Sequence, residues 1–110
     1  RFAAARELQE RMGTHVVLKG AGSIVASPGR VPAVVCAGNP GMATGGMGDL
    51  LTGCIAALVA QGFAAGDAAV AGALLHAGAG DAAVRDEGER GLLPSDLLPW
   101  LRRLANPMRR

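Results

Sequence analysis

The sequence predicts an α/β fold, with a small β-sheet in the first third of the chain and packed helices after it. Three observations support this prediction. Short β-branched runs come early, helical apolar spacing begins after residue 49, and a glycine-rich stretch separates the two. Half of the 110 residues are hydrophobic, which suffices for a packed core and excludes disorder. Because only 3% are aromatic and 17 are glycine, that core must combine Ala, Val and Leu with closely packed backbones.

The first forty residues predict one helix and three strands. Apolar residues at helical spacing indicate an amphipathic helix from Phe2 to Met12, which Gly13 ends. Glycine and Pro-Gly turns then separate short apolar runs. The expected strands are His15–Leu18, Ser23–Ala26 and Val31–Cys36. Three short strands are too few for a complete sheet of this kind, so we expect further strands upstream of Arg1.

The rest of the chain predicts three helices. The first covers about Asp49 to Gln61. Asp67 can cap the second, whose Val70, Leu74 and Leu75 are expected to face a core. A charged loop, Arg85–Arg90, leads to a last helix that Ser95 caps. The apolar residues of that helix are Leu97, Leu98, Leu101 and Leu104. Because the chain opens on Arg1 without a Met, we interpret residues 1–110 as the C-terminal portion of one domain.

Charge and cysteine usage narrow the function classes. The net charge is only +2, and no aromatic residues interleave with the terminal arginines, so nucleic-acid binding is not expected. No apolar stretch is long enough to span a membrane. Cys36 and Cys54 lie in apolar runs and are expected to be buried free thiols, as in the reducing cytoplasm. No His/Cys/Asp cluster has the spacing of metal ligands.

The stretch from Gly38 to Asp49 carries the most chemistry. Gly45, Gly46 and Gly48 leave backbone N–H groups uncovered directly before a helix, where the helix dipole favours anions. Asp49 could accept a proton from a substrate hydroxyl held beside that anion. Alternatively, the glycines form an ordinary turn and Asp49 only caps the helix. The spacing fits neither the P-loop nor the dinucleotide glycine motif.

The longer pattern resembles a known family. Gly45-Gly46-Met47-Gly48-Asp49 with Leu50-Leu51-Thr52-Gly53 resembles the anion-hole and catalytic-base motif of ribokinase-like enzymes. Gly38 to Gly46, Val17 to Ser23, Leu75 to Asp81 and Gly91 to Leu97 are similar to the NAD(P)H-hydrate dehydratases within that superfamily. The resemblance runs from about Val16 to Leu98. It departs at Met47, where threonine is more common, which puts the fine geometry of the anion hole in question.

The resemblance implies dehydration of hydrated NADH or NADPH, driven by ADP or ATP. It implies that Asp49 is catalytic and binds the substrate, with Asn39 and Gly41 as further substrate contacts. The implied nucleotide-binding residues are Lys19, Gly20, Ala21, Gly22, Ser23, Gly45, Gly46 and Gly48. The Ala/Gly/Arg-rich composition looks bacterial and favours ADP. Any Mg²⁺ ligands would lie outside this chain. A preceding epimerase domain and a homo-oligomer are left open.

Two other functions share these features. A ribokinase-like kinase of a small alcohol would use the same glycine loop and aspartate. A degenerate nucleotide-binding module without catalysis is the second alternative, which the intact Asp49 disfavours. Outside the loop, we expect His76 to be packed or hydrogen-bonded and His15 to be structural or exposed. Asp81, Asp86, Glu87 and Glu89 are interpreted as a charged surface.

Overall fold

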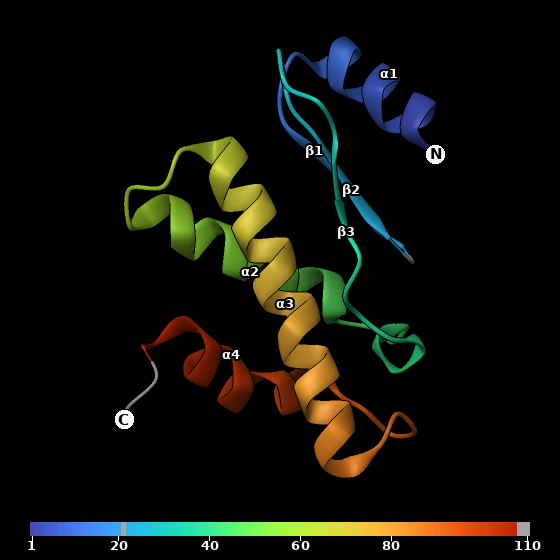
Figure 1. The fold of residues 1–110 in the computed structure, drawn as a ribbon, viewed down its shortest axis with the longest axis vertical. Helices are drawn as coiled ribbons and strands as arrows, with labels where there is room; N and C mark the ends of the chain where they lie inside the picture. Colours follow the sequence, from blue (N-terminus) through green and yellow to red (C-terminus); the bar gives the residue numbers. More distant parts are fainter. Residues whose placement is uncertain (21, 108–110) are drawn as a thin grey trace.

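A computed structural model describes residues 1–20 and 22–107, and it confirms the predicted α/β class. The order of elements is α1 (Phe2–Met12), β1 (Val16–Leu18), β2 (Ser23–Ala26), β3 (Ala33–Val35), the 3₁₀ turn η1 (Pro40–Met42), α2 (Met47–Ala60), α3 (Ala65–Glu87), the 3₁₀ turn η2 (Pro94–Leu97) and α4 (Leu98–Ala105). Figure 1 shows the long α3 running between the sheet, α2 and α4. The predicted strands and helices are present, and the first and third strands are shorter than expected.

The three strands form an antiparallel sheet in the order β1-β2-β3. Val25 of β2 pairs with Val17 of β1 and with Ala33 of β3. Side chains alternate between the two faces of a strand, so Val25 and its neighbour Ile24 enter different cores. Ile24 packs with Ala5 of α1, whereas Val25 packs with α2 and α3. The sheet therefore lies between α1 and the α2–α3 pair.

Small residues make the close contact between α2 and α3. A Cβ on Gly72 of α3 would lie only 2.6 Å from Cγ1 of Ile55 and 3.3 Å from its Cα. The buried face of α3 accordingly consists of Ala and Gly together with His76. The expectation that Leu74 faces a core is wrong, because its side chain is 50% exposed. Val70 does pack against the sheet core, as predicted.

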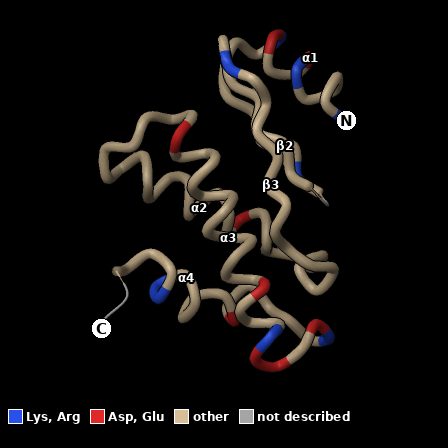
Figure 2. The backbone as a smooth tube through the Cα atoms, viewed as in Figure 1, with Lys and Arg blue, Asp and Glu red and all other residues tan. Residues whose placement is uncertain are grey.

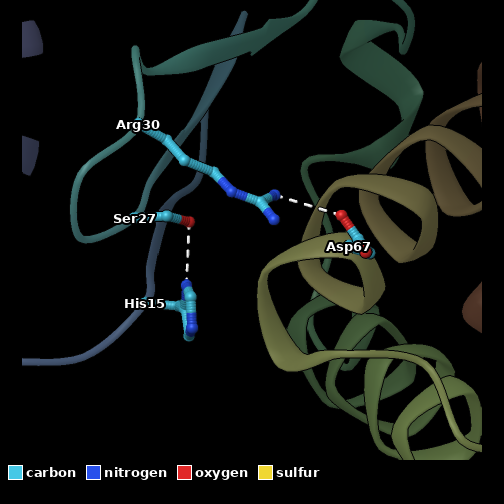
Figure 3. A network of polar contacts seen from close by, with 4 residues as sticks. All are labelled: His15, Ser27, Arg30 and Asp67. Atoms are coloured by element: carbon cyan, nitrogen blue, oxygen red, sulfur yellow. Dashed lines mark hydrogen bonds and ion pairs between the residues drawn. The ribbon is translucent and has the colours of Figure 1, made fainter.

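The first turn of α3 differs from the prediction. The helix begins at Ala65, so Asp67 is its third residue and makes no capping hydrogen bond. Instead the Asp67 carboxylate accepts a bond of 3.1 Å from Arg30 in the loop before β3 (Figure 3). Beside it, Nδ1 of His15 lies 2.8 Å from Oγ of Ser27 (Figure 3), which agrees with a structural role for His15.

The C-terminal part of the chain differs from the prediction in the length of α3 and in the residue that caps the last helical segment. The helix α3 continues to Glu87, so the predicted charged loop is partly helical, and Figure 2 shows charges of both signs around its C-terminal end. Ser95 does not cap a helix, because it lies within η2. The capping carboxylate belongs to Asp96, whose Oδ2 accepts a bond of 2.9 Å from the Leu93 amide.

The two cysteines differ in their exposure to solvent. Cys54 is only half-buried, so its expected burial holds in part, whereas Cys36 is exposed, so its expected burial is wrong. Cys36 directly follows β3, where the chain leaves the sheet for the glycine-rich loop. Among the helices of residues 1–20 and 22–107, none combines the length and apolarity needed to cross a membrane.

Candidate functional site

The glycine loop leads directly into α2, as predicted, and the helix begins two residues earlier than expected. Its N-cap is Gly46, whose φ of 93° lies in the left-handed region that favours glycine. Gly48 and Asp49 are the second and third helical residues, whose amides have no intrahelical acceptor. Gly45 faces open space. The loop therefore presents uncovered N–H groups at the positive end of the helix dipole.

Lys19 lies over this helix end. Its Nζ is 2.6 Å from the position that a Cβ on Gly48 would occupy, so any side chain at Gly48 would displace the lysine. The two ion pairs found in the described part of the chain do not include Lys19. The ammonium and the helix N-terminus are both positive, so they repel each other. An anion bound between them would be attracted to both and would offset this repulsion. The structure thus brings together two segments that the sequence linked only by resemblance.

The turn after β1 is held by its own polar groups. The Gly20 amide donates to Ser23 Oγ at 3.3 Å, and Ser23 Oγ lies 3.1 Å from the Gly20 carbonyl. The guanidinium of Arg1 donates to the carbonyl oxygens of Lys19 and Gly22 at 3.3 and 3.1 Å. Sequence reasoning missed Arg1, because nothing local relates it to this turn. The predicted contact at Ala21 lies outside the described residues.

Asp49 is exposed in the first turn of α2. Because Gly46 occupies the N-cap position and α2 has no side-chain capping bond, Asp49 does not cap the helix. Among the described residues, no hydrogen bond or ion pair is found for its carboxylate. It is therefore available to a substrate next to the uncovered amides.

Asn39 and Gly41 lie at the other end of the loop and pack against α3. Asn39 Nδ2 donates to Oδ1 of Asp81 at 2.9 Å, and the Gly38 amide donates to Oδ2 at 3.0 Å. A Cβ on Gly41 would come within 2.8 Å of the Glu89 carbonyl oxygen. The interpretation of Asp81 as charged surface is wrong, because it is half-buried and bonded to the loop. The sequence did offer one sign of a role for Asp81, because it ends the Leu75–Asp81 segment that resembles the dehydratase family.

His76 of α3 is buried, with 6% of its surface exposed, which confirms a packed histidine. Burial lowers the pKa of His76; a hydrogen bond to the Met47 backbone opposes this, and the charge of Lys19 lowers the pKa further. The ring is therefore neutral at physiological pH. Its Nε2 is buried and has no hydrogen-bond partner among the described residues. His76 thus lies beneath the first turn of α2.

Met47 points away from the anion site. Its side chain is 2% exposed and packs with Ala79, Ala83, Leu92 and Leu97. The departure from the common threonine therefore fills a core and leaves the backbone amides of the loop in place.

A surface hollow lies apart from this site. It opens between the end of α3 and α4, where the guanidinium of Arg103 stacks 4.8 Å from the ring centroid of Trp100. None of the glycine-loop residues line it. No group of three or more His, Cys, Asp or Glu side chains within residues 1–20 and 22–107 could hold a metal ion.

The fold and the site define an α/β protein of the ribokinase-like type, with an uncovered glycine turn at a helix N-terminus. The model of the NAD(P)H-hydrate dehydratase family matches residues 1–103, and the chain belongs to that family. It is 58% identical over 106 residues to the bifunctional NAD(P)H-hydrate repair enzyme Nnr of Vibrio cholerae, covering 96% of this chain and 21% of the relative. It is 44% identical over 107 residues to the ADP-dependent (S)-NAD(P)H-hydrate dehydratase of Neisseria meningitidis, covering 96% of this chain and 36% of the relative.

A solved structure shares the architecture. The ADP/ATP-dependent NAD(P)H-hydrate dehydratase of Bacillus subtilis, co-crystallised with ATP/Mg²⁺, superposes with a TM-score of 0.87 at 29% identity. The match covers 96% of this chain and 38% of the Bacillus chain. The chain thus spans about a fifth of the bifunctional relatives and between a third and two fifths of the dehydratases.

Proposed function

We propose that the protein containing this chain dehydrates hydrated NADH or NADPH, with ADP as the preferred nucleotide. The observation that carries the proposal is the Lys19 ammonium lying over Gly48 at the N-terminus of α2, with Asp49 one residue further on. A positively charged site for an anion beside an available carboxylate would support this reaction. The Neisseria relative is named for ADP, which supports ADP over ATP. We further propose that residues 1–110 are the C-terminal portion of one dehydratase domain.

We propose that the backbone amides of the glycine loop and the Lys19 side chain bind the phosphate groups of the nucleotide. The amides of Gly45, Gly46 and Gly48 would donate to phosphate oxygens, and charge that develops there would meet fixed dipoles. Lys19 supplies the opposing positive charge. The turn that it begins would hold the rest of the nucleotide through Gly20, Ala21, Gly22 and Ser23. The hydrogen bonds between Gly20 and Ser23 keep that turn closed.

Asp49 is proposed as the base. Its carboxylate can accept the proton of the ring hydroxyl as that oxygen attacks the terminal phosphorus of ADP, the bond from that phosphorus to the rest of ADP breaks, and AMP leaves. The oxygen then departs as phosphate, a far better leaving group than hydroxide, when the C–O bond breaks and the adjacent C–H proton passes to solvent. Asp49 is also proposed to bind the hydrated ring. The exposure of Asp49 beside the loop supports both roles.

Asn39 and Gly41 are proposed to contribute to substrate binding through the backbone of the loop. The amide of Asn39 is bound to Asp81, and Gly41 is pressed against the Glu89 backbone, so both fix the loop path. The Bacillus structure was obtained with Mg²⁺, and we place any Mg²⁺ ligands of the full protein outside this chain. Relatives named bifunctional support a fused second domain, which we propose to be an epimerase. A homo-oligomer and a cytoplasmic location remain predictions.

The test uses the full-length protein, purified, with hydrated NADH and either ADP or ATP. We expect nucleotide-dependent recovery of NADH absorbance, faster with ADP. A kinase of a small alcohol would instead form a phosphorylated product with no recovery of NADH. ADP binding without turnover of any offered substrate would favour the degenerate binding module and reject the dehydratase proposal.

A further inference from the structure

The segment from Gly38 to Met42 is fixed to α3 at three points. The carboxylate of Asp81 accepts bonds from the Gly38 amide and the Asn39 side chain, at 3.0 and 2.9 Å. One residue earlier on α3, a Cβ on Gly80 would overlap the sulfur of Met42. These contacts join residues about 40 positions apart in the chain, and the two Asp81 bonds span separations of 43 and 42.

The geometry specifically suits a carboxylate at residue 81. Two donors, one from the backbone and one from a side chain, each meet a different oxygen of the same group. An ionised carboxylate accepts only, so both bonds are charge-assisted and neither needs a proton to reorient. Asn39 Oδ1 is buried and has no hydrogen-bond partner within residues 1–20 and 22–107, which indicates that the Asp81 bond sets the orientation of the Asn39 amide.

The loop beyond this anchor leads straight to the anion site. Four residues, numbers 43–46, connect η1 to α2, and two of them are the glycines 45 and 46. Gly45 has no neighbour within 4 Å of a Cβ position, so nothing there packs against the loop from that side. Gly46 does have a neighbour, because a Cβ there would lie 3.1 Å from Cγ of Pro94. The path of this short segment therefore depends on that contact and on its two ends, which are η1 and the first turn of α2.

We infer that Asp81 is a positioning residue for the proposed dehydratase reaction, holding the Gly38–Asn39 turn so that the Gly45–Gly46 backbone meets the phosphate in a fixed orientation. The inference rests on the proposed function. Asp81 does not touch the reacting atoms; it acts through the loop. A displacement of about 1 Å by a remote substitution can cost about 10²-fold in rate, because the reacting groups must be held in a narrow geometry.

The test compares three variants of the full-length protein. Asp81→Ala removes both bonds, and Asp81→Asn keeps an oxygen for the Gly38 amide. Asp86→Ala is the matched control, because Asp86 is an exposed carboxylate of the same helix, outside the loop contacts. Each variant is measured for kcat and KM with hydrated NADH, for ADP affinity by calorimetry, and for hydrogen–deuterium exchange of the peptide covering residues 38–46.

We expect Asp81→Ala to lower kcat/KM by about 10²-fold and to speed exchange in residues 38–46, at a temperature where the protein is fully folded. Asp81→Asn should recover most of this loss, and Asp86→Ala should match wild type. A folded Asp81→Ala with kcat/KM within twofold of wild type would overturn the inference. Equal losses in the Ala and Asn variants would also overturn it, because the bond from the Gly38 amide, which Asn retains, would then contribute nothing to the position of the loop.

Two further outcomes are covered by the design. If Asp81→Ala does not fold, the Asn variant decides. Its kcat/KM must then be lower than that of wild type, and its exchange in residues 38–46 must be faster than in wild type. Wild-type values for both quantities reject the inference. If wild type shows no dehydratase activity, the proposed function fails on its own. The positioning role is then judged by ADP affinity and loop exchange, and unchanged values in Asp81→Ala reject it.

Discussion

Replacing Asp49 with Asn separates a catalytic carboxylate from a structural one. Asn keeps the shape of the side chain and removes its negative charge and its basicity. In a capping position the substitution would be nearly silent, because Asn is as good an N-cap as Asp. The structure places Asp49 third in α2, behind the N-cap Gly46 and without a capping bond, so no hydrogen bond to the helix is lost.

The magnitudes of the two effects differ enough to be told apart. The stability cost is limited to the charge–dipole interaction at the helix N-terminus, about 0.3–1 kcal/mol at an exposed site. The catalytic cost of losing a general base is about 10²–10⁴-fold in rate, which corresponds to about 2.7–5.4 kcal/mol of activation free energy. The kinetic effect should therefore be at least about twice the largest stability effect.

The assay measures turnover with saturating ADP, the free energy of unfolding in urea, and the dissociation constant for ADP, all on the full-length protein. Asp67→Asn is the matched control, because Asp67 is the third residue of α3 and also lies in a first helical turn. Its substitution removes a similar dipole interaction, together with the Arg30 ion pair, far from the glycine loop. It should lower stability by about as much or slightly more, with normal turnover.

ADP should bind Asp49→Asn as tightly as wild type or slightly more tightly, because a negative charge beside its phosphates is gone. A folded variant that dehydrates at a near-normal rate would refute the reasoning and remove Asp49 from the mechanism. A fall in turnover matched by an equal fall in Asp67→Asn would refute it as well, because general destabilisation would then explain both.

Three other predictions follow from the same contacts. Lys19→Met should raise the dissociation constant for ADP by about tenfold or more and weaken its dependence on salt, measured by calorimetry at two ionic strengths. In urea unfolding, Gly72→Ala should be neutral to destabilising by about 2 kcal/mol, because overpacking against Ile55 offsets the helix-propensity gain of about 1 kcal/mol; Gly78→Ala, whose Cβ meets its nearest atom at 3.5 Å, should be stabilising. Since the pKa of His76 is lowered in the folded state, its contribution to the free energy of unfolding should be fully present above the ordinary pKa of 6.5 and be lost as pH falls towards the lowered value. The difference in free energy of unfolding between wild type and His76→Asn should therefore shrink as pH falls. A difference that does not change with pH would contradict this prediction.

The sequence predicted the elements and the glycine loop because both are local signals. Apolar spacing located α2 to within two residues, and the early start arises because Gly46 takes the N-cap position that the pattern assigned to Asp49. Hydropathy failed on α3, where it placed Leu74 inside. The reason is physical: α2 and α3 approach so closely that glycine is required opposite Ile55, so small residues fill the buried face and a leucine lies outside.

The contacts that position the site were not predictable from local pattern. Asp81 reaches residues 42 and 43 positions away, and the Arg30–Asp67 pair spans 37 positions. In a single sequence, a lone carboxylate among Ala and Gly residues gives no sign of which donors it will meet. Resemblance to the family marked the segment containing Asp81 but assigned the residue no role, whereas its two hydrogen bonds in the structure indicate one.

The helix α3 joins these observations, since one rigid element supports both ends of the glycine loop. Ala69, Ala73 and Ala77 pack against the sheet, and His76 lies beneath Met47 in the first turn of α2. One turn further on, Asp81 holds the Gly38 end of the same loop. A helix of 23 residues changes length very little, so the spacing between these supports is set by the α-helical rise of about 1.5 Å per residue. The loop can therefore stay open to a ligand at Gly45, which has no neighbour within 4 Å of a Cβ position, while its two ends keep a fixed separation.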